Sequence, residues 1–160
     1  KEKMKKINLK LIVKSVVDDF NSIYEPKRGI QIILKDLDLD IKEDYFINGI
    51  ENRIEQIIAN LLDNSISFSD NNKKILVEIS KNEKNKIILK VIDEGKGFKE
   101  TSTKKIFDRF YSNRPDNFGE HSGLGLNIVK NLVDLHGATI NASNNIMQKG
   151  ANVEIVFPKV

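Results

Sequence analysis

Apolar residues recur at helical spacing in three segments of the chain, and this pattern predicts three helices. The first begins after Asn8, a plausible N-cap, and runs to about Tyr24, where Pro26 is expected to stop it. The second covers about residues 50–68, and the third covers residues 123–136 and ends at Gly137. Each helix carries one apolar face, so we expect all three to pack on a common core.

Shorter β-branched runs between these segments predict strands. Residues 75–80 and 87–93 flank the polar turn Lys81–Lys86 and are typical of a hairpin. The other expected strands are residues 30–34, 45–47, 139–142 and 153–157. The sum is an α+β fold, a two-layer sandwich of three main helices packed on a mixed, mostly antiparallel five-stranded sheet.

A long polar stretch, residues 94–122, separates the hairpin from the third helix. Loops of this length in a compact domain are usually functional lids or disordered. Its one apolar island, Ile106–Tyr111, could anchor a flap over a ligand or form a small satellite core.

Composition narrows the classes of function. The 160 residues are 39% hydrophobic and 31% charged, which is typical of one globular domain and predicts a single unit over residues 1–160. The absence of cysteine excludes disulfides, thiolate metal sites and thiol nucleophiles. The net charge of +3 is spread along the chain, so we expect no nucleic-acid partner. No apolar run approaches the length of a membrane span.

Two asparagines lie four residues apart on the second predicted helix, within the run Asn60-Leu61-Leu62-Asp63-Asn64. Positions at this spacing share a helix face, so both carboxamides are expected beside the apolar stripe. An amide oxygen is a hard, neutral ligand that suits magnesium. The alternative is a pair of polar residues on a solvated helix edge.

Asp93, Gly95 and Gly97 follow the second strand of the hairpin as a D-x-G-x-G motif. A carboxylate at a strand end could accept a hydrogen bond from an exocyclic amine, and the glycines would let the backbone turn and approach a flat ligand. An ordinary turn after a strand is the alternative.

The run Ser122-Gly123-Leu124-Gly125-Leu126 opens the third helix. Unpaired N–H groups and the helix dipole favour an anion at such a position, although glycines also occur there for packing. Arg109 could fold onto a phosphate as a mobile charge. Of the two histidines, His136 is expected to be structural, and His121 could touch a ligand.

The order of these four motifs resembles that of the catalytic, ATP-binding domain of bacterial sensor histidine kinases, within the superfamily that includes gyrase, Hsp90 and MutL. The N box would be residues 60–69, the G1 box 93–97, the F box 106–111 and the G2 box 122–126. The resemblance covers nearly the whole chain and implies the Bergerat ATP-binding fold with an ATP lid at about residues 98–122. The segment around the G2 box looks most like alphaproteobacterial sensor kinases of envelope or acid stress.

The resemblance implies ATP and Mg2+ as cofactors and a role for each matched residue. Asp93 would bind the adenine amine, Gly95 and Gly97 would shape the pocket, and Asn64 would coordinate magnesium with help from Asn60. The implied phosphate and lid contacts are Ser122, Gly123, Leu124, Gly125 and Leu126 around the phosphates, Arg109 at the γ-phosphate, and Phe107 and Phe110 in the lid.

Asn60 separates branches of the superfamily. The hydrolases and related serine kinases carry a glutamate there as general base, whereas an amide cannot accept a proton at neutral pH. The resemblance therefore favours a histidine kinase over an ATPase or serine kinase. The family usually has a basic residue soon after its second asparagine, where this chain has Ile66 and Ser67. A degenerate domain that only binds nucleotide or a partner is the remaining alternative.

Neither histidine lies in a phosphoacceptor sequence, and the chain begins with Lys1. We therefore expect a fragment whose phosphoacceptor and dimerisation helices and sensor region are absent, so that it cannot phosphorylate itself. The expected partners are the dimerisation domain of the same parent protein and, indirectly, a response regulator. The parent is expected to be membrane-anchored and homodimeric, and this fragment cytoplasmic and monomeric.

Overall fold

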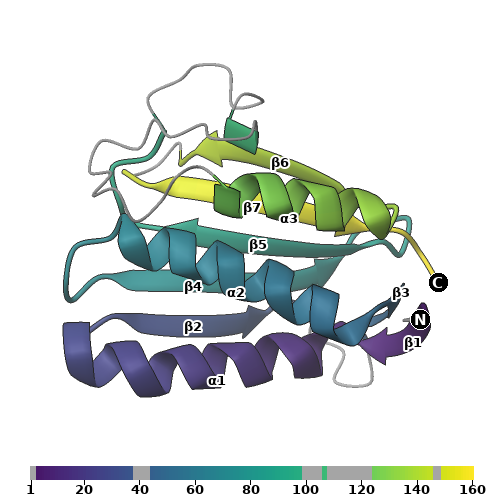
Figure 1. The fold of residues 1–160 in the computed structure, drawn as a ribbon, viewed down its shortest axis with the longest axis horizontal. Coiled ribbons are helices and arrows are strands. Elements are labelled where there is room, and N and C mark those ends of the chain that lie inside the picture. The colour runs from purple at the N-terminus through teal and green to yellow at the C-terminus, as the bar shows by residue number, and fades with distance from the viewer. Residues whose placement is uncertain (1–2, 38–43, 99–105, 108–123, 146–148) are drawn as a thin grey trace.

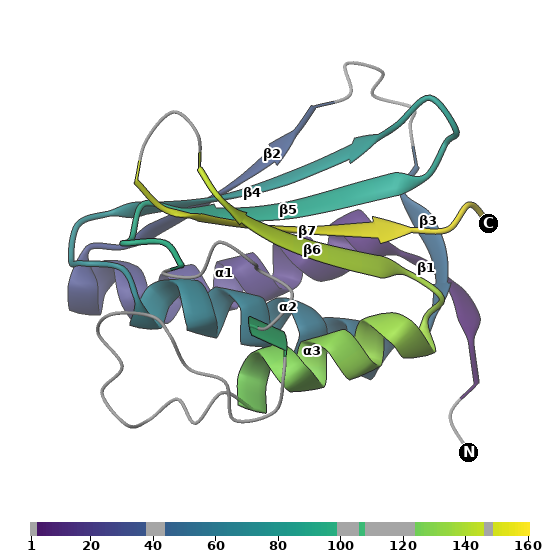
Figure 2. The same cartoon turned by 90° about the horizontal axis from the view of Figure 1, so that it is seen from above.

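The computed structural model describes residues 3–37, 44–98, 106–107, 124–145 and 149–160. Three helices cover one face of a five-stranded sheet (Figures 1 and 2). These are α1 (Leu9–Arg28), α2 (Glu51–Ser67) and α3 (Leu124–Leu135). The predicted α+β sandwich is therefore confirmed, with α2 lying between α1 and α3.

The main sheet has the strand order β2-β4-β5-β7-β6. Its members are β2 (Gln31–Asp36), β4 (Lys74–Lys81), β5 (Ile87–Asp93), β6 (Thr139–Asn144) and β7 (Ala151–Phe157). Only the β2–β4 pair is parallel, and the other three pairs are antiparallel. Alternate residues of β4, β5 and β7 are buried, as expected for a sheet whose one face packs on helices.

A second, two-stranded sheet pairs β1 (Lys5–Asn8) with β3 (Phe46–Gly49). The sequence pattern predicted β3 but not β1. The four residues of β1 carry no apolar alternation of their own, and they become a strand because β3 supplies the antiparallel partner.

The prediction that Pro26 stops the first helix is wrong. Helix α1 continues through Pro26 to Arg28 and ends at Gly29, whose N–H donates to the carbonyls of Tyr24 and Glu25. Pro26 lies in the last turn of α1, where the final carbonyl groups already lack partners within the helix. The hydrogen bond lost with its missing N–H therefore disturbs the helix little. The predicted N-cap is confirmed, because Asn8 Oδ1 accepts from the N–H of Lys10 at 3.1 Å.

The structural role expected for His136 is confirmed. Its side chain is 6% exposed, and its Nε2 accepts a hydrogen bond from the N–H of Ile50 at 3.1 Å. The proton must then lie on Nδ1, which donates to the carbonyl of Leu132 at 2.7 Å. His136 thereby joins the end of α3 to the start of α2.

Among the described helices, none has the length and apolar character needed to cross a membrane.

Candidate functional site

Three elements that carry predicted site residues lie near one another. The C-terminal half of α2 and the Asp93 end of β5 lie toward the left of Figure 1, and α3 begins near the middle of this view, beside α2. Helix α2 packs directly against both β5 and α3. The fold therefore brings together motifs that lie up to about 65 residues apart in the sequence, from Asn60 to Gly125.

Asp93 is the last residue of β5, and only 1% of its surface is exposed. Its Oδ1 accepts hydrogen bonds from the N–H of Gly95 at 2.9 Å and from the N–H of Ala151 at 3.1 Å. A carboxylate so deeply buried has to be compensated by donors, and two main-chain N–H groups do part of this here. These contacts fix the orientation of the carboxylate relative to the sheet.

Two glycines allow the backbone to pack tightly around Asp93. Gly97 has a φ of +78°, and a Cβ there would approach Asn144 Oδ1 to 2.6 Å. Gly150 has a φ of +139°, and a Cβ there would lie 1.9 Å from the carbonyl oxygen of Asp93. Both positions therefore require glycine for conformational and steric reasons. The sequence motif predicted the first glycine but not the second.

Asn60 and Asn64 lie on α2 and are both half-buried, next to the fully buried Leu62 and the nearly buried Leu61. This placement beside the core agrees with the predicted helix face. In the part of the chain that the structure describes, no group of three or more acidic or histidine side chains could hold a metal ion. The amide oxygens of Asn60 and Asn64 are hard, neutral ligands of the kind that magnesium accepts together with water and phosphate oxygens.

The first turn of α3 presents a different surface from the one expected of a packed glycine. Gly125 is exposed, and apart from its chain neighbours and the backbone of its own helix, no described atom lies within 4 Å of where a Cβ would be. Packing against described residues therefore gives no reason for a glycine at this position. Leu126 is 8% exposed and belongs to the core, so only its backbone is left for a ligand.

Part of the predicted apolar island joins the main core. Ile106 and Phe107 are 1% and 8% exposed and belong to the same hydrophobic cluster as the helices. Asn127 of α3 donates from Nδ2 to the carbonyl of Phe107 at 3.1 Å. Several predicted site residues lie outside the described part of the chain. These are Arg109, Phe110, Ser122, Gly123 and the side chain of Leu124, and His121 lies outside it too.

Arg28 makes contacts that the sequence pattern did not reveal. It lies at the end of α1 and donates to the carbonyls of Ile66 at 2.8 Å and Ser69 at 2.6 Å, at the C-terminal end of α2. Helix α2 has no basic residue in its own last turn. A cation from α1 thus stabilises the C-terminal end of α2.

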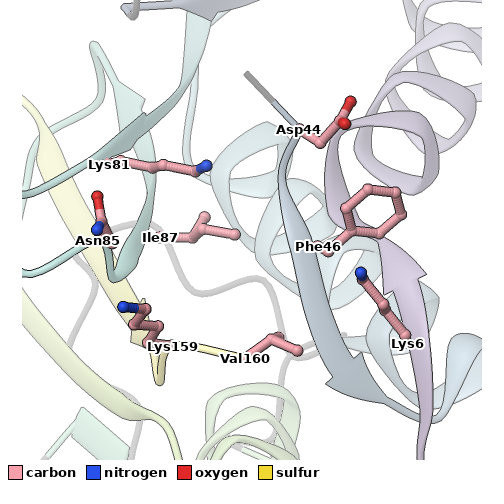
Figure 3. A pocket seen from close by; sticks show the side chains of 8 residues that line it. All are labelled: Lys6, Asp44, Phe46, Lys81, Asn85, Ile87, Lys159 and Val160. Atoms are coloured by element: carbon pink, nitrogen blue, oxygen red, sulfur yellow. The ribbon is translucent and has the colours of Figure 1, made fainter. Parts of the chain in front are cut away.

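A cavity of about 360 Å³ lies near the opposite end of β5, lined in part by Lys6, Phe46, Lys81 and Ile87 (Figure 3). It is bounded by β1, β3, the β4–β5 hairpin and the C-terminal segment, and it contains no predicted site residue. The Nζ of Lys6 lies 4.7 Å from the ring centre of Phe46, and that of Lys81 lies 5.7 Å from the ring centre of Tyr45. These ammonium groups are already engaged with aromatic rings.

Comparison with known proteins identifies similar chains. A family model described as histidine kinase-, DNA gyrase B-, and HSP90-like ATPase matches residues 49–160. Sensor protein ChvG of Agrobacterium fabrum is 34% identical over 148 residues, which cover 90% of this chain and 25% of ChvG. Sensor protein kinase PmrB of Pseudomonas aeruginosa is 32% identical over 130 residues, which cover 81% of this chain and 27% of PmrB. The chain thus spans about a quarter of the length of these relatives.

A solved structure has the same fold as this chain. The catalytic domain of the histidine kinase ThkA, in a nucleotide-free form, superposes with a TM-score of 0.81 at 25% sequence identity. The match covers 98% of this chain and 95% of the ThkA chain.

Proposed function

Because the chain belongs to the family of histidine kinase-, DNA gyrase B- and HSP90-like ATPases, we propose that it binds Mg-ATP and supplies the γ-phosphoryl group to a histidine on a separate dimerisation domain. The observation that carries this proposal is the buried carboxylate of Asp93, oriented at the end of β5, a strand that packs against α2, the helix that carries the two asparagines. The predicted Bergerat fold, with three helices on a mixed five-stranded sheet, is confirmed and gives this arrangement its frame.

Recognition of the base would depend on Asp93. An ionised carboxylate only accepts hydrogen bonds, and the exocyclic amine of adenine donates them. Guanine presents a carbonyl oxygen at the equivalent position, which would face the carboxylate unfavourably. The site should therefore prefer ATP to GTP.

Magnesium would be bound by the carboxamide of Asn64, with Asn60 nearby on the same face of α2. The ion usually keeps several waters and takes few protein oxygens in addition to substrate phosphates, so one or two amide oxygens suit it. When bound, it would offset negative charge on the phosphates.

Phosphates would lie near the start of α3, where main-chain N–H groups point outward and the helix dipole favours an anion. The open space around Gly125 is compatible with such close approach. Gly123, Ser122 and Arg109 are proposed to complete this part of the site.

Transfer to histidine rather than to water follows from the residue at position 60. Asn60 cannot take a proton from water, so hydrolysis should be slow. A neutral imidazole is already nucleophilic and needs mainly to be placed in line with the γ-phosphorus. The bond from the γ-phosphorus to the bridging oxygen breaks, a phosphorus–nitrogen bond forms, and ADP leaves.

The acceptor and the wider context are also proposals. We propose that residues 1–160 form one catalytic domain, monomeric by itself, whose acceptor histidine is carried by the dimerisation domain of the same parent protein. A response regulator would receive the phosphoryl group afterwards. The parent would be a membrane-anchored homodimer with this domain in the cytoplasm.

One observation favours a second candidate, a domain that binds nucleotide without transferring phosphate. Ser67 stands where the family resemblance implies a basic residue, and its hydroxyl donates to the carbonyl of Asp63 at 2.7 Å. Phosphotransfer to a supplied histidine-bearing helical domain would distinguish the two, since the second candidate binds ATP but leaves that domain unmodified.

Calorimetric titration with a non-hydrolysable ATP analogue, with and without magnesium, tests the proposal. Asp93→Asn keeps an oxygen that can accept from Gly95 and Ala151, so the fold should survive. Its affinity should fall about 100-fold, because a charge-assisted hydrogen bond to the adenine amine is lost with the carboxylate. The matched control is Asp134→Asn, an exposed acid on α3 paired with Lys130. Equal affinities for the wild type and Asp93→Asn would refute the proposed site.

A further inference from the structure

Two consecutive asparagines at the end of β6 form hydrogen bonds with the turn that follows β5. Asn144 is the last residue of β6 and Asn145 follows it, about 50 residues after the turn that they contact. Neither belongs to the four motifs of the predicted site. Their contacts reach both ends of the segment from Asp93 to Phe98.

Asn144 binds the far end of this segment with both halves of its side-chain amide. Its Oδ1 accepts from the N–H of Phe98 at 2.6 Å, and its Nδ2 donates to the carbonyl of Phe98 at 2.9 Å. This is the pattern by which two paired residues exchange hydrogen bonds in an antiparallel sheet, with a side chain in place of one backbone. Gly97 is required next to it because a side chain there would meet the same oxygen.

Asn145 binds the near end. Its Nδ2 donates to the carbonyl of Asp93 at 3.1 Å, and its own N–H donates to the carbonyl of Gly150 at 2.9 Å. Together with the bond from Ala151 N–H to the Asp93 carboxylate, this ties both the backbone and the side chain of Asp93 to residues at the end of β6 and the start of β7.

We infer that Asn144 and Asn145 are positioning residues that hold the turn from Asp93 to Phe98, and thereby the carboxylate of Asp93, in the geometry that selects adenine. The inference rests on the proposed function, because it takes Asp93 as the group that recognises the base. Asn144 is exposed and Asn145 half-buried, so their amides contribute mainly to local order and little to the core.

The test replaces each amide with a neutral side chain of similar size, as Asn144→Leu and Asn145→Leu. Asn141→Leu is the matched control, because Asn141 is an exposed residue of the same strand. Each variant is titrated with non-hydrolysable ATP and GTP analogues, its thermal midpoint is measured, and amide hydrogen exchange is followed at Phe98.

Both variants should lower the affinity for the ATP analogue about tenfold, and the preference for ATP over GTP should shrink, while the control behaves as the wild type. The thermal midpoints should match that of the control, and the amide of Phe98 should exchange faster in Asn144→Leu. A purely structural role would instead lower the midpoint and leave the base preference unchanged.

Asp93→Asn, measured alongside, distinguishes a failure of this inference from a failure of the proposed function. If it loses binding while both leucine variants retain the affinity and base preference of the control, the inference is wrong and the proposed function stands. If Asp93→Asn also binds like the wild type, the proposed function fails and the inference fails with it.

Discussion

The two ends of β5 are built in different ways. At the Asp93 end, glycines with positive φ and side chains bonded to main chain fix an irregular turn around a buried carboxylate. At the Ile87 end, regular strand pairs, lysines over aromatic rings and the β1–β3 sheet surround a cavity. None of the predicted site residues lines this cavity. The buried carboxylate of Asp93 and the glycines required around it make the Asp93 end our candidate for the site.

The largest effect should come from Gly150→Ala at the Asp93 end. The new Cβ would lie 1.9 Å from the Asp93 carbonyl oxygen, so the turn must move. We expect a loss of about 3 kcal/mol in the free energy of unfolding, together with loss of nucleotide binding. Denaturant unfolding and calorimetric titration measure the two quantities. Wild-type values for both would show that the packing around Asp93 is unimportant.

His136→Ala should separate stability from binding, because His136 lies at the other end of α3. The substitution leaves the N–H of the half-buried Ile50 without its acceptor and opens a small cavity at the buried His136. The free energy of unfolding should fall by about 2 kcal/mol. Affinity for the ATP analogue, measured well below the thermal midpoint, should stay at the wild-type value. A parallel loss of affinity would mean that the two ends are coupled.

Asn64→Ala should affect only the magnesium-dependent part of binding. Removing an amide ligand should weaken binding with magnesium about tenfold, while titrations in a chelator give the wild-type affinity. Asn141→Ala, an exposed amide away from α2, is the control. An unchanged magnesium dependence would remove Asn64 from the ion's ligands.

Gly125→Ala should have the smallest effect on the fold. No described atom obstructs a Cβ there, and alanine favours a helix over glycine by about 0.8 kcal/mol, so stability should hold or rise slightly. If phosphates approach this turn closely, affinity for the ATP analogue should nevertheless fall severalfold. A stabilised variant with full affinity would place the phosphates elsewhere.

The sequence pattern predicted the three helices and the strands of the main sheet because their apolar periods are long and regular. It failed where a segment depends on a distant partner. The short strand β1 needs β3, and Pro26 is tolerated because it falls in the last turn of α1. Such outcomes are set by tertiary contacts and not by local propensity.

The same limit applies to the candidate site. Asp93, Gly97, Asn60 and Asn64 could be singled out because spacing and strand ends carry information about geometry. Arg28, Asn144 and Gly150 act on segments that are about 40 to 60 residues away, and no local spacing reveals this. A glycine just before a strand, as at Gly150, was the one available signal.

Amide NMR titration with a non-hydrolysable ATP analogue tests the central claim most directly, because it reports where the nucleotide binds. The account predicts shifts concentrated at Gly95, Gly97, Ala151 and the Asn60–Asn64 turn of α2, with the residues around Lys81 and Ile87 unchanged. Shifts centred on the cavity at the Ile87 end, or no shifts at saturating analogue and magnesium, would contradict it.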